Sequence, residues 1–157
     1  MQLVSVGSSR GESNFHLIFT PKYRRDVFVD KEVKRMCVKS FAETCQKLGI
    51  GMEACEFGPD HVHVFVSRCK NCSVPYLAQR LKGASSHMIR HRLWGIVKGK
   101  LWGDSFWSDC YFYRSVGSTT SEAVRYYIEN SQRKHHDILD YEETRIKQEP
   151  RQAKLTD

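Results

Sequence analysis

The feature that most constrains this chain is the stretch at residues 60–66, which reads Asp-His-Val-His-Val-Phe-Val. Strict alternation of this kind is typical of a β-strand whose two faces differ. The three valines form one face, so His61 and His63 lie together on the other, with their Cα atoms about 6.7 Å apart. Imidazoles at that spacing can bind one metal ion. The alternative is a strand with two half-exposed histidines that bind nothing.

The remaining segments give a consistent order of elements. Alternating apolar residues predict strands, and apolar residues at helical spacing predict helices. The predicted strands are residues 14–20, 51–57, 60–66 and 110–116. The predicted helices begin after the caps Asp30, Ser73 and Thr120 or Ser121. This order predicts an α+β, ferredoxin-like (RRM-like) fold, in which a four-stranded antiparallel sheet carries two helices on one face and a further C-terminal helix follows.

The turn Gly58-Pro59-Asp60 joins two of these strands and predicts an antiparallel hairpin. In the strand before it, Met52, Ala54 and Glu56 are predicted to share one face. Because the valines of the next strand need the helix-covered side of the sheet, the histidines are predicted on its open face. A basic protein of this shape would hold nucleic acid there.

The charge of the chain favours a polyanionic partner. Lys and Arg number 25 against 18 Asp and Glu, a net charge of +7, and nucleic acid is the first candidate for a small basic domain. Basic residues gather in the turn at residues 21–25 and on one face of the helix after Ser73. The alternative for both clusters is a solvated basic surface. The candidate DNA contacts are Lys22, Arg24, Arg25, Arg80, Lys82, Ser85 and Arg90.

Two apolar groups accompany these basic clusters. The second helix is predicted to bury the stripe Leu77, Leu81, Ala84 and Met88. Trp102 and Trp107 are expected either to stack on bases or to fill the edge of the core.

The length of 157 residues suits one domain. We expect a flexible arm at residues 1–13, the folded domain at 14–136 and a charged tail at 137–157. No apolar run approaches the roughly 20 residues that span a membrane, and no signal peptide opens the chain. Six cysteines are scattered through apolar or helical segments, so we expect a cytoplasmic protein with reduced thiols.

Taken together, the motifs resemble the single-tyrosine HUH transposases of bacterial and archaeal insertion sequences, the IS200-like family. The resemblance runs from about Phe15 to His135 and depends on the order and spacing of several short motifs. These motifs are residues 19–24, 59–63, 81–85, 101–107, 115–117 and 127–129.

The resemblance implies a mechanism. His61 and His63 would hold a divalent ion, Mg²⁺ or Mn²⁺, that polarises a scissile phosphate, and two imidazoles suit Mn²⁺ better. Tyr127 would attack the phosphorus to give a 5′-phosphotyrosine link and a free 3′-hydroxyl, so that rejoining needs no ATP. The family also implies a homodimer in which the tyrosine helix of one subunit can complete the site of the other, and single-stranded DNA substrates with hairpins near the element's ends.

One departure from the family concerns the third metal ligand. The usual pattern is Tyr-Ile-x-x-Gln, whereas Gln132 here stands one residue further from Tyr127. On a regular helix that position lies about 140° round from the tyrosine, so a π-bulge or another ligand is needed. We predict Gln132 as the third ligand. The alternatives are Asn130 paired with Tyr126 as the nucleophile, and His135 or His136 as the ligand.

Two other functions remain open from the sequence. A non-catalytic or domesticated RRM-like module would hold single-stranded nucleic acid and would need neither histidine nor tyrosine. A metal-dependent hydrolase without a covalent step would need His61 and His63 but not Tyr127.

Overall fold

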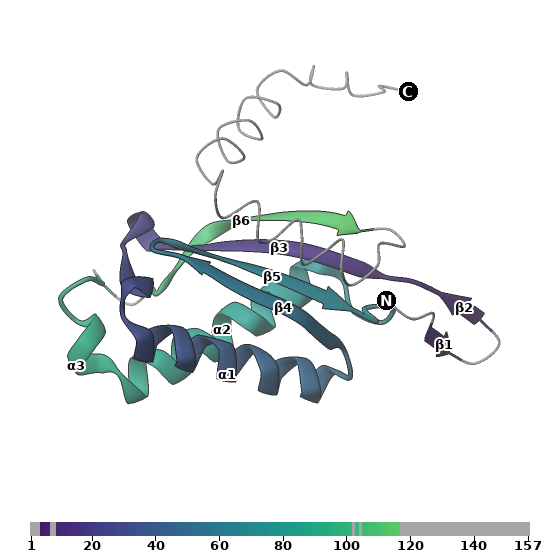
Figure 1. Cartoon of the computed structure of the whole chain (residues 1–157), viewed down its shortest axis with the longest axis horizontal. Coiled ribbons are helices and arrows are strands. Elements are labelled where there is room, and N and C mark those ends of the chain that lie inside the picture. Colours follow the sequence, from purple (N-terminus) through teal and green to yellow (C-terminus); the bar gives the residue numbers. More distant parts are fainter. Residues whose placement is uncertain (1–3, 7–8, 102, 104, 117–157) are drawn as a thin grey trace, which may run out of the picture.

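The structure is a computed structural model that describes residues 4–6, 9–101, 103 and 105–116. Its centre is a four-stranded antiparallel sheet with the strand order β4-β5-β3-β6. The strands are β3 (Asn14–Pro21), β4 (Gly51–Gly58), β5 (His61–Ser67) and β6 (Trp107–Val116). Helices α1 (Lys31–Leu48) and α2 (Val74–Arg92) lie together on one face of it (Figure 1). The predicted sheet with two helices on one face is confirmed.

Four short elements surround this centre. They are the 3₁₀ turns η1 (Lys22–Arg24) and η2 (Val27–Val29), the helix α3 (Trp94–Val97), and a separate two-stranded sheet of β1 (Val4–Val6) and β2 (Ser9–Gly11). The last pair lies within the predicted arm, where the sequence indicated no strands. Strands of three residues are too short to show a period, and main-chain pairing alone defines them.

The ends of α1 follow from its sequence. The Asp30 side chain accepts hydrogen bonds from the backbone N–H groups of Glu32 and Val33 and so caps the first turn. Gly49 ends the helix with φ 69°, a left-handed conformation that glycine adopts without strain. Both boundaries agree with the prediction.

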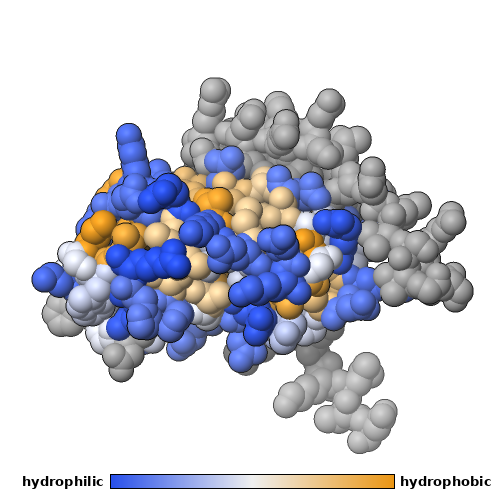
Figure 2. Space-filling view, turned by 90° about the horizontal axis from the view of Figure 1, so that it is seen from below, coloured by the Kyte–Doolittle hydropathy of each residue, from blue (hydrophilic) through white to orange (hydrophobic). Residues whose placement is uncertain are grey.

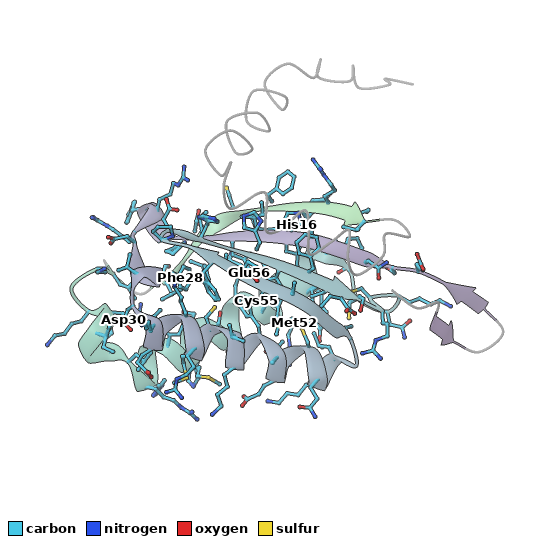
Figure 3. All side chains as sticks on the ribbon, in the orientation of Figure 1. His16, Phe28, Asp30, Met52, Cys55 and Glu56 are labelled. Carbon is cyan, nitrogen blue, oxygen red and sulfur yellow. The ribbon has the colours of Figure 1, made fainter. Side chains whose placement is uncertain are left out.

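The core fills the space between the sheet and the two helices. Leu17 and Phe19 of β3 and the three valines of β5 are buried in one apolar cluster with the inner faces of α1 and α2. Phe28 lies on this side of the sheet, facing α1 (Figure 3). Trp107 is also part of this cluster, which settles its role in favour of the core, whereas the side chain of Trp102 lies outside the described residues.

The predicted faces of β4 are wrong at its start. A β-bulge between Met52 and Ala54 shifts the register, so Met52 pairs with Val66 and Cys55 with Val64. Met52 and Cys55 therefore both pack against the main core (Figure 3), and Ala54 packs on the opposite face. An extra residue in a strand breaks the period of two, which a purely alternating pattern does not anticipate.

The inner stripe of α2 also differs from the prediction. Ala84 is exposed, and Ser85, one position later, is completely buried. The stripe begins at Leu77 and Ala78 and continues four residues at a time through Leu81, Ser85 and Ile89. Its members include a serine because the hydroxyl finds hydrogen-bond partners inside the core, as described below.

None of the helices within the described ranges has the length and apolar character needed to cross a bilayer. All six cysteines lie in the described part of the chain, and none of them forms a disulfide there.

Candidate metal and DNA-binding site

The hairpin of β4 and β5 positions the two histidines. Gly58 pairs with His61 across a turn of only two residues, and the Pro59 carbonyl accepts a hydrogen bond from the Phe28 N–H at 3.1 Å. This bond ties the turn to η2. A Cβ atom built on Gly58 would lie 1.7 Å from Cε1 of His61. Only glycine therefore leaves room for the His61 ring to lie over the end of β4.

His61 is oriented by its neighbour in the chain. Its Nδ1 lies 2.9 Å from Oδ1 of Asp60, and Oδ2 of the same carboxylate lies 3.3 Å from Nε of Arg24. Both carboxylate oxygens are thus engaged, one by the imidazole and one by the guanidinium. Carboxylate partners of this kind commonly fix the tautomer and orientation of histidines that bind metals.

His63 has a different partner, the imidazole of His16 on the adjacent strand β3. Nδ1 of His63 lies 2.9 Å from Nε2 of His16. The His16 ring stacks on Phe65, with centroids 4.2 Å apart and planes 9° from parallel. Burial, with a smaller effect of the nearby Arg114 guanidinium, lowers the pKa of His16 to about 4. His16 is therefore neutral at physiological pH, and each of its two ring nitrogens has a distinct role as donor or acceptor.

The histidines lie on the sheet face away from the helices, as predicted, but this face is not open at their positions. His61 is 1% exposed and His63 is 2% exposed. Figure 3 places His16 on the side of the sheet opposite α1. The side chains that contact the two rings include His16 and Asp60.

The imidazole nitrogens of His61 and His63 are suitable ligands for a divalent metal ion. The two rings are adjacent, with centroids 5.2 Å apart and planes at 84°. Because Nδ1 of each ring is already hydrogen-bonded, coordination would use the Nε2 atoms. Within the described ranges, no group of three or more His, Cys, Asp or Glu residues could hold a metal.

Tyr127 and Gln132 lie outside the described residues. The alternatives Tyr126, Asn130, His135 and His136 lie outside them as well. The nucleophile and the third metal ligand therefore stay predictions from the sequence.

The predicted basic turn follows β3. Lys22, Tyr23 and Arg24 form η1, in which Tyr23 (φ 59°) and Arg24 (φ 52°) have left-handed backbones that are unusual for residues other than glycine. Tyr23 is 68% exposed. Arg25 is also exposed. Strain of this kind is often found at functional sites, and here it brings Arg24 to Asp60.

Two of the predicted DNA contacts on α2 instead have structural partners. The Ser85 hydroxyl is buried, donates to the Leu81 carbonyl at 2.7 Å, and accepts from Nε1 of Trp107 at 2.9 Å. The prediction that Ser85 belongs to the basic surface is therefore wrong. The Lys82 ammonium donates to the Ser108 carbonyl at 2.6 Å, and burial lowers its pKa.

The outer side of α2 keeps the remaining basic candidates. Arg80 is exposed. Further along the helix, a shallow groove of about 380 Å³ is lined by His87, Arg90, His91 and Trp94. Cζ of Arg90 lies 5.3 Å from the centroid of the Trp94 ring, and Nη2 of Arg90 donates to the Gly103 carbonyl at 3.2 Å. Figure 2 looks onto the helix-bearing face and shows groups of hydrophilic side chains around apolar ones.

The sequence interpretation missed three residues of this site: Gly58, Asp60 as a partner of His61, and His16. A polar residue next to the histidine pair was a visible signal for Asp60. His16 had a weaker signal, a polar residue on the outer face of a strand. Its importance depends on the pairing of β3 with β5, which the sequence did not show.

The chain is similar to several known proteins. A family model described as "Transposase IS200 like" matches residues 9–131. The ISDra2 transposase TnpA of Deinococcus radiodurans is 31% identical over 116 residues, which are 74% of this chain and 81% of the relative. The transposase for insertion sequence element IS200 of Salmonella typhimurium is 30% identical over 123 residues, 78% of this chain and 79% of the relative.

Two solved structures share the fold. One is the crystal structure of a Deinococcus radiodurans protein described as a transposase, with a TM-score of 0.65, 27% identity and coverage of 81% of this chain and 96% of that one. The other is a REP-associated tyrosine transposase bound to a REP hairpin, with a TM-score of 0.55, 12% identity and coverage of 85% and 74%. At that identity the second likeness concerns the fold alone.

Proposed function

We propose a mechanism for this chain from one premise: it belongs to the IS200-like transposase family. The proposed reaction is the cleavage and rejoining of single-stranded DNA at the ends of an insertion sequence. The observation that carries this proposal is the pair of adjacent imidazoles, His61 and His63, with both Nδ1 atoms hydrogen-bonded.

The Nε2 atoms of His61 and His63 would hold Mg²⁺ or Mn²⁺, with Gln132 as the proposed third ligand. When bound, the ion would polarise the scissile phosphate and draw charge from its oxygens. The residues around the histidines have a separate role, since they hold the rings in place before the ion and the DNA arrive.

Tyr127 is the proposed nucleophile. Its phenol oxygen would form a bond to the phosphorus while the bond from phosphorus to the 3′-oxygen breaks. The phenol loses a proton and the released 3′-oxygen gains one, which leaves a 5′-phosphotyrosine and a 3′-hydroxyl. The reverse reaction with another 3′-hydroxyl rejoins the DNA without ATP, because the phosphotyrosine keeps the energy of the phosphodiester.

The DNA would contact predicted basic side chains that are exposed or partly exposed. Arg24 pairs with Asp60 beside the histidine site, Lys22 and Arg25 are close to it in the chain, and Arg80 and Arg90 belong to α2. No acidic residue occurs between His61 and Gly103, so α2 itself carries no acid that would repel a phosphate. A hairpin substrate is supported by the transposase of the same fold that holds a REP hairpin. Each phosphate contact should make the affinity more dependent on salt.

We further propose that the active form is a homodimer whose tyrosine helices complete the histidine sites in trans. The Tyr127→Phe and His61→Ala variants should each be inactive alone. Cleavage that returns when the two variants are mixed and form heterodimers would support this arrangement. If the mixture stays inactive although heterodimers form, each site is completed within its own subunit.

A covalent-adduct assay tests the proposed reaction. A pool of labelled single-stranded oligonucleotides, each with a hairpin beside randomised flanks, is incubated with the protein and Mn²⁺ and separated on a denaturing protein gel. We expect a labelled adduct that is lost in Tyr127→Phe and kept in the matched control Tyr126→Phe. An adduct lost only in Tyr126→Phe would reassign the nucleophile.

Other outcomes distinguish the rival functions. Cleavage without any adduct, lost in His61→Ala, would indicate a hydrolase. Tight binding with neither cleavage nor adduct would indicate a non-catalytic, single-stranded nucleic-acid-binding module.

A further inference from the structure

We propose that Asp60 and His16 are positioning residues for the two candidate metal ligands, and that Arg24 acts on the site through Asp60 as well as through any contact with DNA. This inference rests on the proposed function, because it assigns roles around the same histidine pair. It differs from that function in concerning residues that would act on the metal site without touching the metal.

The first argument concerns the direction of the hydrogen bond at His61. An ionised carboxylate can only accept, so the 2.9 Å contact between Asp60 Oδ1 and His61 Nδ1 places the proton on Nδ1. A neutral imidazole then has its lone pair on Nε2, the atom that can bind a metal. The fit of the ring over Gly58 restricts its position further.

Arg24 holds the carboxylate in turn. Its Nε lies 3.3 Å from Asp60 Oδ2, the oxygen that His61 does not use. The two contacts on opposite oxygens fix the rotation of the carboxylate. Arg24 reaches Asp60 because its own backbone is left-handed at φ 52°, so the unusual conformation of η1 has a structural consequence at the histidine site.

His63 is oriented by a neutral ring instead of a carboxylate. For His63 to bind a metal through Nε2, its Nδ1 must carry the proton and donate to Nε2 of His16, 2.9 Å away. The 4.2 Å stack on Phe65 holds the His16 ring in the plane that this bond requires. The two ligands therefore differ in their support, one backed by a charged acceptor and the other by a neutral one.

The experiment measures Mn²⁺ binding by titration calorimetry without DNA. Partners of metal-binding histidines contribute about 10- to 100-fold to metal affinity. We expect such a loss in Asp60→Ala and a smaller loss in Asp60→Asn, which keeps an acceptor oxygen without the charge. His16→Phe keeps the stack on Phe65 and removes the acceptor, so it should lose about tenfold.

Arg24→Ala should lose no more than about fivefold, because its ion pair is half exposed. The matched control is Arg35→Ala, which removes the same charge from the exposed pair with Glu32 and should leave Mn²⁺ affinity unchanged.

A second readout needs no metal. Nitrogen-15 NMR of the histidine rings reports which nitrogen carries the proton in the metal-free protein. We expect His61 and His63 with Nδ1 protonated in the wild type, and a mixture of tautomers at His61 in Asp60→Ala and at His63 in His16→Phe. A residue that only stabilised the fold would lower the melting temperature without changing the tautomers.

The results separate this inference from the proposed function. If Mn²⁺ binding depends on His61 and His63 but is unchanged in Asp60→Ala and His16→Phe, the positioning roles are refuted and the metal site stands. If the wild type binds Mn²⁺ independently of both histidines, the proposed metal site itself fails. Nε2-protonated tautomers in the folded wild type would overturn the inference even if metal binds.

Discussion

Replacing Ser85 with alanine tests whether this serine is a core residue or a DNA contact. The substitution removes the oxygen that accepts the hydrogen bond from Trp107 Nε1 at 2.9 Å. Trp107 is 5% exposed and Ser85 is fully buried, so water cannot easily replace the lost acceptor. The Leu81 carbonyl, which the Ser85 hydroxyl also contacts, stays within the backbone hydrogen bonding of α2.

The loss of stability in Ser85→Ala comes from the Trp107 N–H, which is left without its acceptor. A buried N–H without an acceptor costs about 1–3 kcal/mol, so the free energy of unfolding should fall by about 2 kcal/mol. In a chain of this size, each kcal/mol lowers the melting temperature by about 2–4 °C. Ser85→Ala should therefore melt about 4–8 °C below the wild type. Its affinity for hairpin DNA, measured well below that temperature, should not change.

Thermal and urea unfolding followed by circular dichroism provide the stability values, and fluorescence anisotropy with a labelled hairpin provides the affinity. Ser86→Ala is the matched control, since Ser86 is the adjacent, partly exposed serine of the same helix, and it should change stability by less than about 0.5 kcal/mol. The double variant Ser85→Ala with Trp107→Phe should be less destabilised than the sum of the single variants. Wild-type stability combined with weak DNA binding in Ser85→Ala would refute the structural role.

Three further substitutions or measurements follow from the structure. Gly58→Ala should displace the His61 ring and lower Mn²⁺ affinity at least about tenfold, and unchanged affinity would show that the ring can shift without loss. Gly83→Ala, which meets nothing within 4 Å on the exposed side of α2, should raise the free energy of unfolding by about 0.5–1 kcal/mol; a decrease in urea midpoint would contradict this. Burial raises the pKa of Cys69 to about 12, so this thiol stays protonated and unreactive until the pH approaches that value. Iodoacetamide at pH 8, followed by mass spectrometry, should modify exposed Cys110 first, and early modification of Cys69 in the folded protein would be inconsistent with its burial.

Much of the fold could be predicted because its signals are local. The cap at Asp30, the left-handed Gly49 and the two-residue turn after Gly58 each depend on neighbouring residues alone. The alternation of β5 likewise needs no distant contact to separate the valines from the histidines. The errors arose where one residue changed the register, at the bulge in β4, or where a polar side chain found a buried partner, at Ser85.

The candidate site divides in the same way. The sequence by itself determined that His61 and His63 share one face of a strand, because side chains alternate along any extended backbone. Only the tertiary structure decided that both rings are buried, that His16 contacts His63, and that Arg24 pairs with Asp60. Strand order brings His16 to His63, and the backbone of η1 brings Arg24 to Asp60. Contacts between segments that are far apart in the chain leave no periodic trace in the sequence.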